Sequence, residues 1–171
     1  MKRIVVSAVC SILAMSTQAI AASKTVDVLG SAGRSIGKIE LASGHHGTLI
    51  RVTLGAGSLT SGWHGIHLHS VGDCSDVGKF KMSKGHVNPG KTMHGLLNPE
   101  GPHPADLPNI FAFTDGSVTS ELFAPGVSLG GAGANLTDKD GSAIVIHANP
   151  DDHMKQPIGG AGPRVACAVI K

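Results

Sequence analysis

The chain has 171 residues, of which 41% are hydrophobic and only 3% aromatic, and it contains 24 glycines and no tyrosine. This length suits a single domain of ordinary size with room for a buried core. Without Lys2 and Arg3, which lie in the leader described next, the 14 basic residues fall to a number equal to the 12 acidic ones. Neither nucleic acid nor an anionic membrane is therefore expected as the main partner.

The N-terminus has the pattern of a leader. Lys2 and Arg3 precede an apolar stretch from Ile4 to about Met15, and Ala19-Ile20-Ala21-Ala22 offers small residues to a signal peptidase. We expect residues 1–22 to be a signal peptide cleaved after Ala21 or Ala22, and residues 23–171 to form a single periplasmic domain. No later apolar run is long enough to span a bilayer, so no membrane contact is expected after cleavage.

Short β-branched and alternating segments fill the mature part, and none shows a helical period. They are residues 25–29, 35–41, 48–54, 63–70, 109–114, 118–123, 143–148 and 165–170. Eight short strands separated by turns predict an all-β fold, an eight-stranded antiparallel sandwich or flattened barrel. Asp115-Gly116 is typical of a hairpin turn, and Asp140-Gly141 ends another turn.

Two long connections, residues 71–108 and 149–163, interrupt this succession of strands. Loops of such length inside a compact domain are usually functional or disordered. Histidines recur through the first loop, and the second contains Asp151 and Asp152. This content favours function.

The stretch His64-Gly65-Ile66-His67-Leu68-His69 predicts half of a metal site. Side chains two apart on a strand point the same way, so His67 and His69 can converge while Ile66 and Leu68 enter the core. Imidazole ligands favour copper or zinc over calcium or magnesium. Taken by itself, the stretch is also compatible with a strand that has a histidine-rich solvent face.

The remaining ligands form two candidate sets. Three imidazoles and one carboxylate, a closed tetrahedral set for zinc, come from His86, His94, His103 and Asp106. A strand histidine, His147, joins His67 and His69 as an imidazole set for copper. Each histidine alone is more often solvated or hydrogen-bonded, but their number and their concentration at strand ends favour metal binding.

Two cysteines, Cys74 and Cys167, remain once Cys10 leaves with the signal. In an oxidising compartment an even pair predicts a disulfide, with two buried free thiols as the alternative.

In its motifs the sequence resembles the bacterial periplasmic copper,zinc superoxide dismutases, over essentially all of the mature chain. The resemblance rests on residues 64–69, Gly85-His86-Val87-Asn88-Pro89, His94-Gly95, residues 101–109, 141–152, and 160–170 with Arg164 and Cys167 inside. It implies a Greek-key β-barrel with one copper and one zinc ion per subunit. Copper would be bound by His67, His69, His86 and His147, and zinc by His86, His94, His103 and Asp106.

The resemblance also assigns roles. His86 would bridge the metals and carry a proton to the peroxide, and Arg164 would attract and orient the substrate, superoxide. Asp151 would join His67 to His94, and Cys74 and Cys167 would form the family's disulfide. The implied reaction is dismutation of superoxide to oxygen and hydrogen peroxide, as protection against extracytoplasmic superoxide. Copper would cycle between its two oxidation states, whereas zinc is redox-inert.

Four lysines of the first loop, Lys79, Lys81, Lys84 and Lys91, are candidates for a field that steers the anion. For any one of them, simple solvation of the loop is an equal alternative. Among the other histidines, His64 is expected to be a structural or an exposed residue, and His45, His46 and His153 are expected to be exposed and not to bind the metals, with recruitment of metal at the surface as their alternative. Trp63 is compatible with core packing or with a surface interface.

Two other classes of protein compete with an enzyme. A copper and zinc carrier or buffer on the same fold would have no need of Arg164. An interaction sandwich of the immunoglobulin type would not collect so many histidines around its loops. The resembled bacterial family includes both dimers and monomers, and for this chain we expect a homodimer, with a monomer as the alternative.

Overall fold

The structure is a computed structural model that describes residues 22–171. Residues 1–21, and with them nearly all of the expected signal peptide, lie outside the described residues. Strands are β1 (Ala22–Gly30), β2 (Ser35–Gly44), β3 (Gly47–Leu54), β4 (Gly62–His64), β5 (Ile66–His69), β6 (Ile110–Ala112), β7 (Val118–Pro125), β8 (Val127–Ser128), β9 (Ala134–Asn135), β10 (Ser142–His147) and β11 (Arg164–Ile170). One 3₁₀ turn, η1 (Lys81–Ser83), completes the secondary structure of this part of the chain.

All eight predicted segments occur as strands, with two differences. The segment 63–70 is divided into β4 and β5 at Gly65, and the very short β8 and β9, which pair in parallel, were not predicted. Within residues 22–171 no helix has the length and hydrophobicity needed to cross a bilayer.

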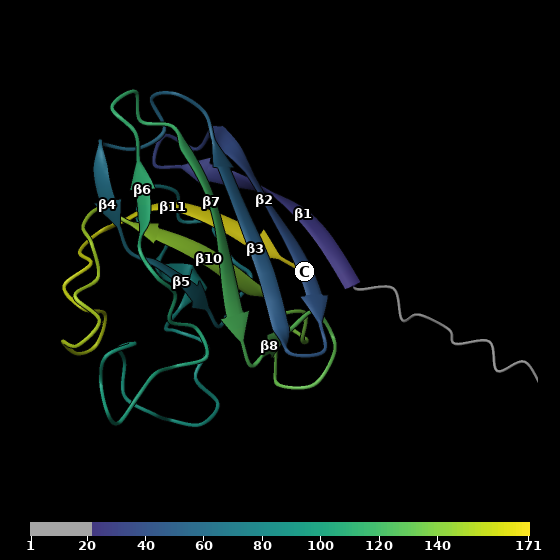
Figure 1. Cartoon of the computed structure of the whole chain (residues 1–171). Coiled ribbons are helices and arrows are strands. Elements are labelled where there is room, and N and C mark those ends of the chain that lie inside the picture. The colour runs from purple at the N-terminus through teal and green to yellow at the C-terminus, as the bar shows by residue number, and fades with distance from the viewer. Residues whose placement is uncertain (1–21) are drawn as a thin grey trace, which may run out of the picture.

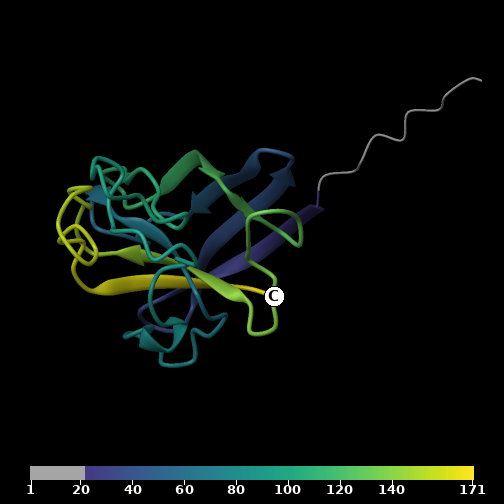
Figure 2. The same ribbon diagram turned by 90° about the horizontal axis from the view of Figure 1, so that it is seen from below.

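Seven strands form one antiparallel sheet in the order β5-β10-β11-β1-β2-β3-β7. This sheet curls on itself, as the two views at right angles show (Figures 1 and 2). The edge strands of this sheet are β5 and β7. A small ladder between β4 and β6 links these edges, because β4 runs on into β5 and β6 leads into β7 through the turn at residues 113–117. Strands that are distant in the sequence also lie side by side: β3 pairs with β7, and β5 pairs with β10. Such long-range antiparallel pairing is typical of the Greek-key arrangement.

The barrel interior follows from alternation along the strands. Ile39 and Leu41 on β2 and Ile50 and Val52 on β3 are buried, whereas the residue between each pair, Glu40 or Arg51, is exposed. Strand β10 differs because it is buried along its whole length. One of its faces enters the barrel core, and the other contributes Ala143 and Val145 to a second cluster with residues 74, 80 and 167.

A disulfide joins Cys74 to Cys167 and closes a loop of 93 residues. It ties the first long loop to β11, which confirms the expected pairing. Closing a loop of this size restricts the unfolded chain by about 4 to 5 kcal/mol on the entropic model.

Both long loops lie on the same side of the barrel, beside β5 and β10 (Figure 1). Asn109 links them, because its Nδ2 donates to the Asp151 carbonyl oxygen and its Oδ1 accepts from the Asp151 amide, each at 2.9 Å. Irregular backbone is therefore held next to two regular strands, and this is where the histidines gather.

Candidate metal centre

Three of the histidines come from the paired strands β5 and β10. His67 lies opposite Val145 and His69 opposite Ala143 in the register of the two strands, and His147 ends β10. Ligand atoms of His67, His69 and His147 lie within 4.8 Å of one another, and all three residues are buried. Ile66 and Leu68 belong to the barrel core, so their expected direction into the core is confirmed.

Each of these rings has one hydrogen-bonded nitrogen and one free nitrogen. His67 Nε2 donates to Asp151 at 2.7 Å, His69 Nδ1 donates to the Lys84 carbonyl at 2.8 Å, and His147 Nδ1 donates to the Gly162 carbonyl at 3.0 Å. The opposite nitrogens, His67 Nδ1, His69 Nε2 and His147 Nε2, are buried and have no hydrogen-bond partner among the described residues. A buried acceptor left in this way is costly unless an ion or a donor satisfies it.

Burial also keeps these rings neutral. It lowers the pKa of His67 to about 4 and that of His147 to about 3, and it lowers the pKa of His69 well below its ordinary value. Metal ligation requires the neutral imidazole, so all three rings are ready to bind a metal at neutral pH.

The second set comes entirely from the first long loop. His86, His94, His103 and Asp106 offer ligand atoms that all lie within 4.8 Å of one another. The distances from Asp106 Oδ1 to Nδ1 are 2.8 Å for His94, 3.2 Å for His86 and 3.5 Å for His103. Asp106 Oδ2 is occupied by the amides of Gly95 and His103, at 2.8 and 2.9 Å. The other oxygen therefore remains for a cation, with three imidazole nitrogens around it.

Charge at this second set is fixed by the same contacts. Burial alone would raise the pKa of Asp106, but hydrogen bonds with His86 and His94 hold it well below its usual range. Burial lowers the pKa of His94, yet hydrogen bonds with Asp106 and Asp151 raise it overall, to about 9.

Two residues connect the sets. His86 places Nδ1 among the second set, while its buried Nε2 has no hydrogen-bond partner among the described residues, and its ring centroid is 4.3 Å from that of His67. Asp151 accepts from His67 Nε2 at 2.7 Å and lies 3.1 Å from His94 Nε2. The two sets are therefore joined once through an imidazole ring and once through a carboxylate.

Gly159 makes room for that carboxylate. Its φ is 59°, and a β-carbon at this position would collide with Asp151 Oδ1. Any side chain here would push Asp151 away from His67 and His94.

Arg164 stands at the start of β11, opposite His147 of β10. Its Nη1 donates to the Phe80 carbonyl at 2.6 Å and to Ser83 Oγ at 3.1 Å, and its Nη2 donates to the Lys84 carbonyl at 2.7 Å. The guanidinium is thus held by the backbone around η1.

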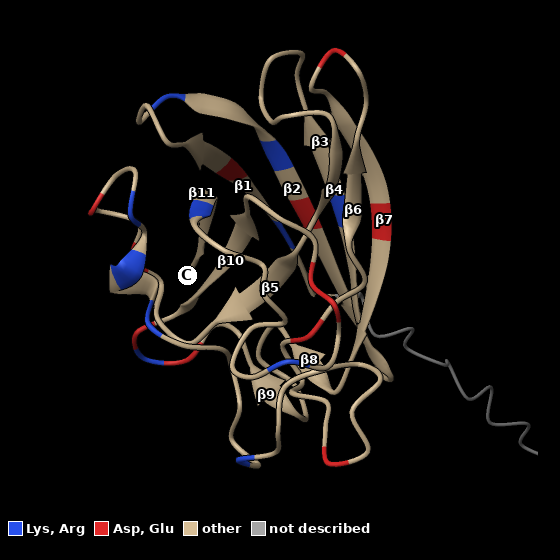
Figure 3. Cartoon of the chain, turned by 90° about the vertical axis from the view of Figure 1, so that its left-hand side faces the viewer, with Lys and Arg blue, Asp and Glu red and all other residues tan. Residues whose placement is uncertain are grey.

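A surface cavity of about 650 Å³ is lined by Arg164 together with Lys79, Lys81 and Lys84. In Figure 3 the basic residues, in blue, of the short helical turn η1 lie on the same side of the molecule as the start of β11. Lys91, the fourth lysine considered for steering, does not line this cavity.

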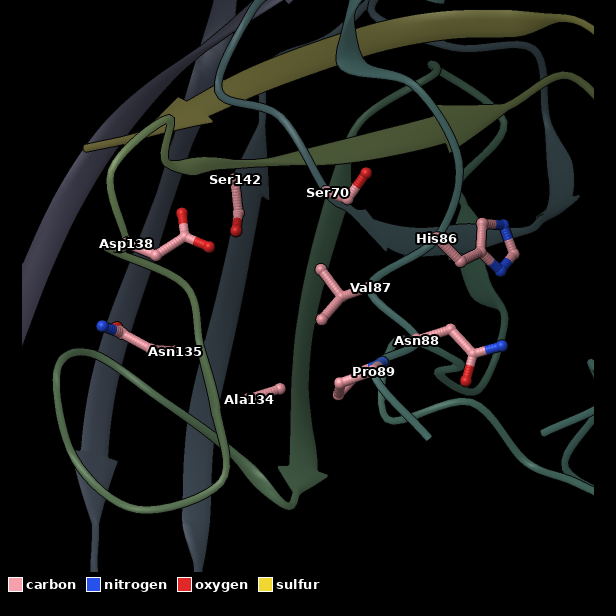
Figure 4. Close-up of a pocket in the computed structure, with 9 residues that line it drawn as sticks. All are labelled: Ser70, His86, Val87, Asn88, Pro89, Ala134, Asn135, Asp138 and Ser142. Carbon is pink, nitrogen blue, oxygen red and sulfur yellow. The ribbon is translucent and has the colours of Figure 1, made fainter. Parts of the chain in front are cut away.

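A different cavity of about 420 Å³ reaches His86 from Asp138 and Ser142 (Figure 4). The ring of His86 stands at one end of it and points away from the other lining residues. The ring nitrogens of His86 therefore do not face this cavity.

Of the remaining histidines, His64 fits the structural alternative and His153 is less exposed than expected. His64 is buried, and its Nδ1 and Nε2 contact the carbonyl oxygens of His147 and Thr60 at 2.7 and 2.8 Å. His153 is partly buried and lies 3.3 Å from Asn109 and 3.6 Å from Asp151. His45 and His46 are exposed at the turn between β2 and β3, as expected.

The sequence reasoning also missed Asn109, Gly159 and the carbonyl of Lys84. Asn109 and Gly159 fall inside or beside the motifs, but only the fold shows that they contact Asp151. Nothing in the sequence around Lys84 indicates that its carbonyl serves the site.

Comparisons with known proteins agree with this geometry. A family model described as copper/zinc superoxide dismutase matches residues 35–170. The superoxide dismutase [Cu-Zn] of Caulobacter vibrioides is 50% identical over 152 residues, covering 87% of this chain and 86% of its own. The superoxide dismutase [Cu-Zn] 1 of Aquifex aeolicus is 41% identical over 166 residues and covers 96% of each chain.

Solved structures show the same relationship. A Cu/Zn superoxide dismutase from Brucella abortus superposes with a TM-score of 0.69 at 30% identity, covering 88% of this chain and 100% of its own. A protein from Bacillus subtilis called SOD-like superposes with a TM-score of 0.80 at 34% identity, covering 86% and 97%. The chain belongs to the copper/zinc superoxide dismutase family.

Proposed function

We propose that the protein dismutates superoxide to oxygen and hydrogen peroxide, with copper held by His67, His69, His86 and His147 and zinc held by His86, His94, His103 and Asp106. The observation that carries this assignment is the group of His67, His69 and His147, whose ligand atoms lie within 4.8 Å of one another and whose unpartnered nitrogens are buried. The ring of His86, whose Nε2 is also buried and unpartnered, has its centroid 4.3 Å from that of His67 and 5.1 Å from that of His69. Neutral imidazole nitrogens suit copper. The three nitrogens and one carboxylate oxygen of the second set suit zinc.

Copper would supply one-electron redox chemistry, and zinc would hold His86 at Nδ1. The chain's own residues supply the rest. Arg164 attracts and orients the anion from the wall of the 650 Å³ cavity. His86 accepts a proton at Nε2, the nitrogen that faces the copper set, and delivers it to the peroxide product. Asp151 holds the rings of His67 and His94 in the orientation that ligation requires.

Lys79, Lys81 and Lys84 are proposed to add to the attraction at the mouth of this cavity. Positive charge beside a narrow site raises the encounter rate of an anion by roughly 10- to 1,000-fold in favourable cases. Lys91 is expected to contribute less, because it lies outside the lining of the cavity.

We further propose that the protein is exported to the periplasm by cleavage after Ala21 or Ala22, and that it then has no membrane contact. The leader pattern of residues 1–22, the disulfide and the bacterial relatives support this proposal. Strand β1 begins at Ala22, so cleavage after Ala21 would leave it whole and cleavage after Ala22 would remove its first residue.

A homodimer is proposed for the mature protein, with a monomer as the alternative. Trp63, Phe111 and Phe113 are 56%, 40% and 51% exposed, and the rings of Trp63 and Phe111 meet edge to face with centroids 5.1 Å apart. An aromatic cluster of this kind is typical of interface cores. Sedimentation of Trp63→Lys beside the unchanged protein tests this interface. A shift from dimer to monomer would support an interface at the aromatic cluster, and an unchanged dimer would show that the interface lies elsewhere.

The copper assignment is tested by His147→Ala, with His46→Ala as the matched control. Loss of His147 Nε2 should reduce copper affinity and dismutation severely while the far-ultraviolet circular dichroism stays unchanged. His46 is exposed and outside both ligand sets, so its variant should behave like the unchanged protein. Full activity in folded His147→Ala would contradict the assignment.

A further inference from the structure

The turn between β2 and β3 presents two histidines that the metal centre does not use. Gly44 pairs with Gly47, so His45 and His46 alone form the loop of this hairpin. Their rings meet edge to face, with centroids 5.0 Å apart and planes at 81°. Because both residues are exposed, an ion from solution can reach their ring nitrogens.

This ring arrangement resembles that of imidazoles assigned to one ion in the metal centre. The rings of His67 and His147 have centroids 5.0 Å apart and planes at 69°. Those of His69 and His86 have centroids 5.1 Å apart and planes at 73°. The exposed pair has the same spacing and nearly the same tilt, so its two rings can each offer a nitrogen to a single ion.

Buried hydrogen bonds hold the base of the turn. Ser43 Oγ accepts from the Leu129 amide at 2.8 Å and lies 2.7 Å from Thr48 Oγ1. Thr48 Oγ1 in turn donates to the Val127 carbonyl at 2.9 Å. The backbone that carries the two histidines is therefore fixed before an ion binds, which reduces the entropy lost on binding.

The surroundings of the pair restrict the kind of ion. Both histidines line a concavity of about 390 Å³, whose walls include Leu49 and Phe123. None of the described residues that line it carries a carboxylate. Calcium and magnesium need oxygen ligands, whereas imidazole suits copper, nickel and zinc. The concavity therefore favours a transition metal.

The proposed cleavage after Ala21 would place a third ligand beside the turn. Ala22, the first residue of β1, pairs with Ser43, two residues before His45. Figure 1 shows the start of β1 beside the end of β2. From the spacing of paired strands and the rise per residue, the Cα atoms of Ala22 and His45 are roughly 8 to 9 Å apart. A free α-amino group on Ala22 would thus lie close enough to share an ion with an imidazole.

We propose that His45, His46 and the α-amino group of Ala22 form a surface site for one divalent transition-metal ion, with Cu(II) bound most tightly. The part of the amine rests on the proposed cleavage after Ala21, and no part of the site depends on dismutation. Because this site offers fewer ligands than the copper set, the metal centre fills first and the surface site takes up copper only in excess.

The test is a calorimetric titration of Cu(II) into the mature protein already loaded with copper and zinc. We expect uptake of one further Cu(II) per chain, with a second electron paramagnetic resonance signal that shows coupling to nitrogen. His45→Gln and His46→Gln should each lose this uptake, because each removes one imidazole. Lys38→Gln, at an exposed position of β2, is the control and should keep it.

A form with one additional residue before Ala22 tests the amine. It keeps both imidazoles but moves the amine away from the turn. Its affinity for the further Cu(II) should fall by at least about 10-fold, the loss that even the hydrogen-bond partner of a ligand causes. Mass spectrometry of the exported protein identifies the residue at which the mature chain begins.

Uptake that persists in both glutamine variants would overturn the site. Unchanged affinity in the extended form, or a mature chain that does not begin at Ala22, would overturn the part of the amine, while the glutamine variants would still decide the imidazole pair. A loaded protein without dismutase activity would contradict the proposed function and leave the outcome of this titration unaffected.

Discussion

At the scale of single residues, the metal centre is built by hydrogen bonds that leave chosen nitrogens free. His67, His69 and His147 each donate from one ring nitrogen, to Asp151, Lys84 and Gly162 respectively. The tautomer of each ring is therefore set before any metal binds, and the free nitrogen of each is the one that faces the site. Residues that position these acceptors should therefore affect metal affinity nearly as strongly as the ligands themselves.

Gly159 is such a residue, and Gly160 beside it provides a matched control. Both have positive φ, 59° and 72°, but only at Gly159 would a β-carbon strike Asp151. Both alanine variants should lose stability through backbone strain, about 1 to 2 kcal/mol each. Only Gly159→Ala should also lower zinc affinity, by about 10- to 100-fold, as measured by competition with a chelator. Equal affinities in the two variants would contradict the role of Gly159.

His86 is the one residue that we assign to both ligand sets. His86→Ala should therefore weaken copper and zinc together, whereas His69→Ala should weaken copper and His103→Ala should weaken zinc. Metal content after dialysis against graded chelator concentrations measures each affinity. A loss of copper alone in His86→Ala would argue against a shared ligand.

At the scale of elements, the burial of β5 and β10 couples the histidines to stability. Because burial lowers the pKa of His67 to about 4 and of His147 to about 3, the unfolded chain binds more protons than the folded chain below pH 6.5. The unfolding free energy of the metal-free protein should therefore decrease as the pH is lowered below 6.5, by up to about 1.4 kcal/mol per pH unit for each such histidine.

His94 acts in the opposite direction. Its raised pKa, about 9, contributes stability that is fully present below pH 6.5 and is lost as the pH rises through 9. The two effects together predict a maximum near pH 6.5 for the metal-free protein in urea titrations. A shallower acid limb in His147→Gln would support the assignment, and an acid limb as steep as that of the unchanged protein would contradict it.

The disulfide serves the connection between the first long loop and β11. Replacing both cysteines by alanine should lower the unfolding free energy by about 2 to 5 kcal/mol, as measured by denaturant titration. Reducing agent should have a similar effect on the unchanged protein and none on the double variant. Equal stability of the oxidised and reduced forms would show that the bridge does not restrict the chain.

Much of the fold and site could be predicted from local patterns. The alternation of His67 and His69 with Ile66 and Leu68 needs only strand geometry, and the first-loop ligands are chemically distinctive. Whether His64 is buried or exposed could not be predicted, because it depends on the break at Gly65. There the Gly65 amide donates to Asn149 and its carbonyl accepts from His147, so the strand changes partner and His64 turns inward.

At the scale of the whole molecule, the barrel supplies one rigid wall of the site and the loops supply the other. Strands β5 and β10 fix three histidines, the first loop provides His86 and the remaining ligands, and the second loop provides Asp151. The 650 Å³ cavity lined by Arg164 opens beside this junction. A carrier could use the same two ligand sets, so the presence of metal does not by itself distinguish a carrier from an enzyme.

The most direct measurement is therefore the rate of superoxide dismutation by the mature, oxidised protein loaded with copper and zinc, beside a zinc-only sample. We expect fast turnover that requires copper and weakens as salt screens the cavity. A folded sample shown to hold both metals, but without activity, would contradict the account and favour a metal carrier.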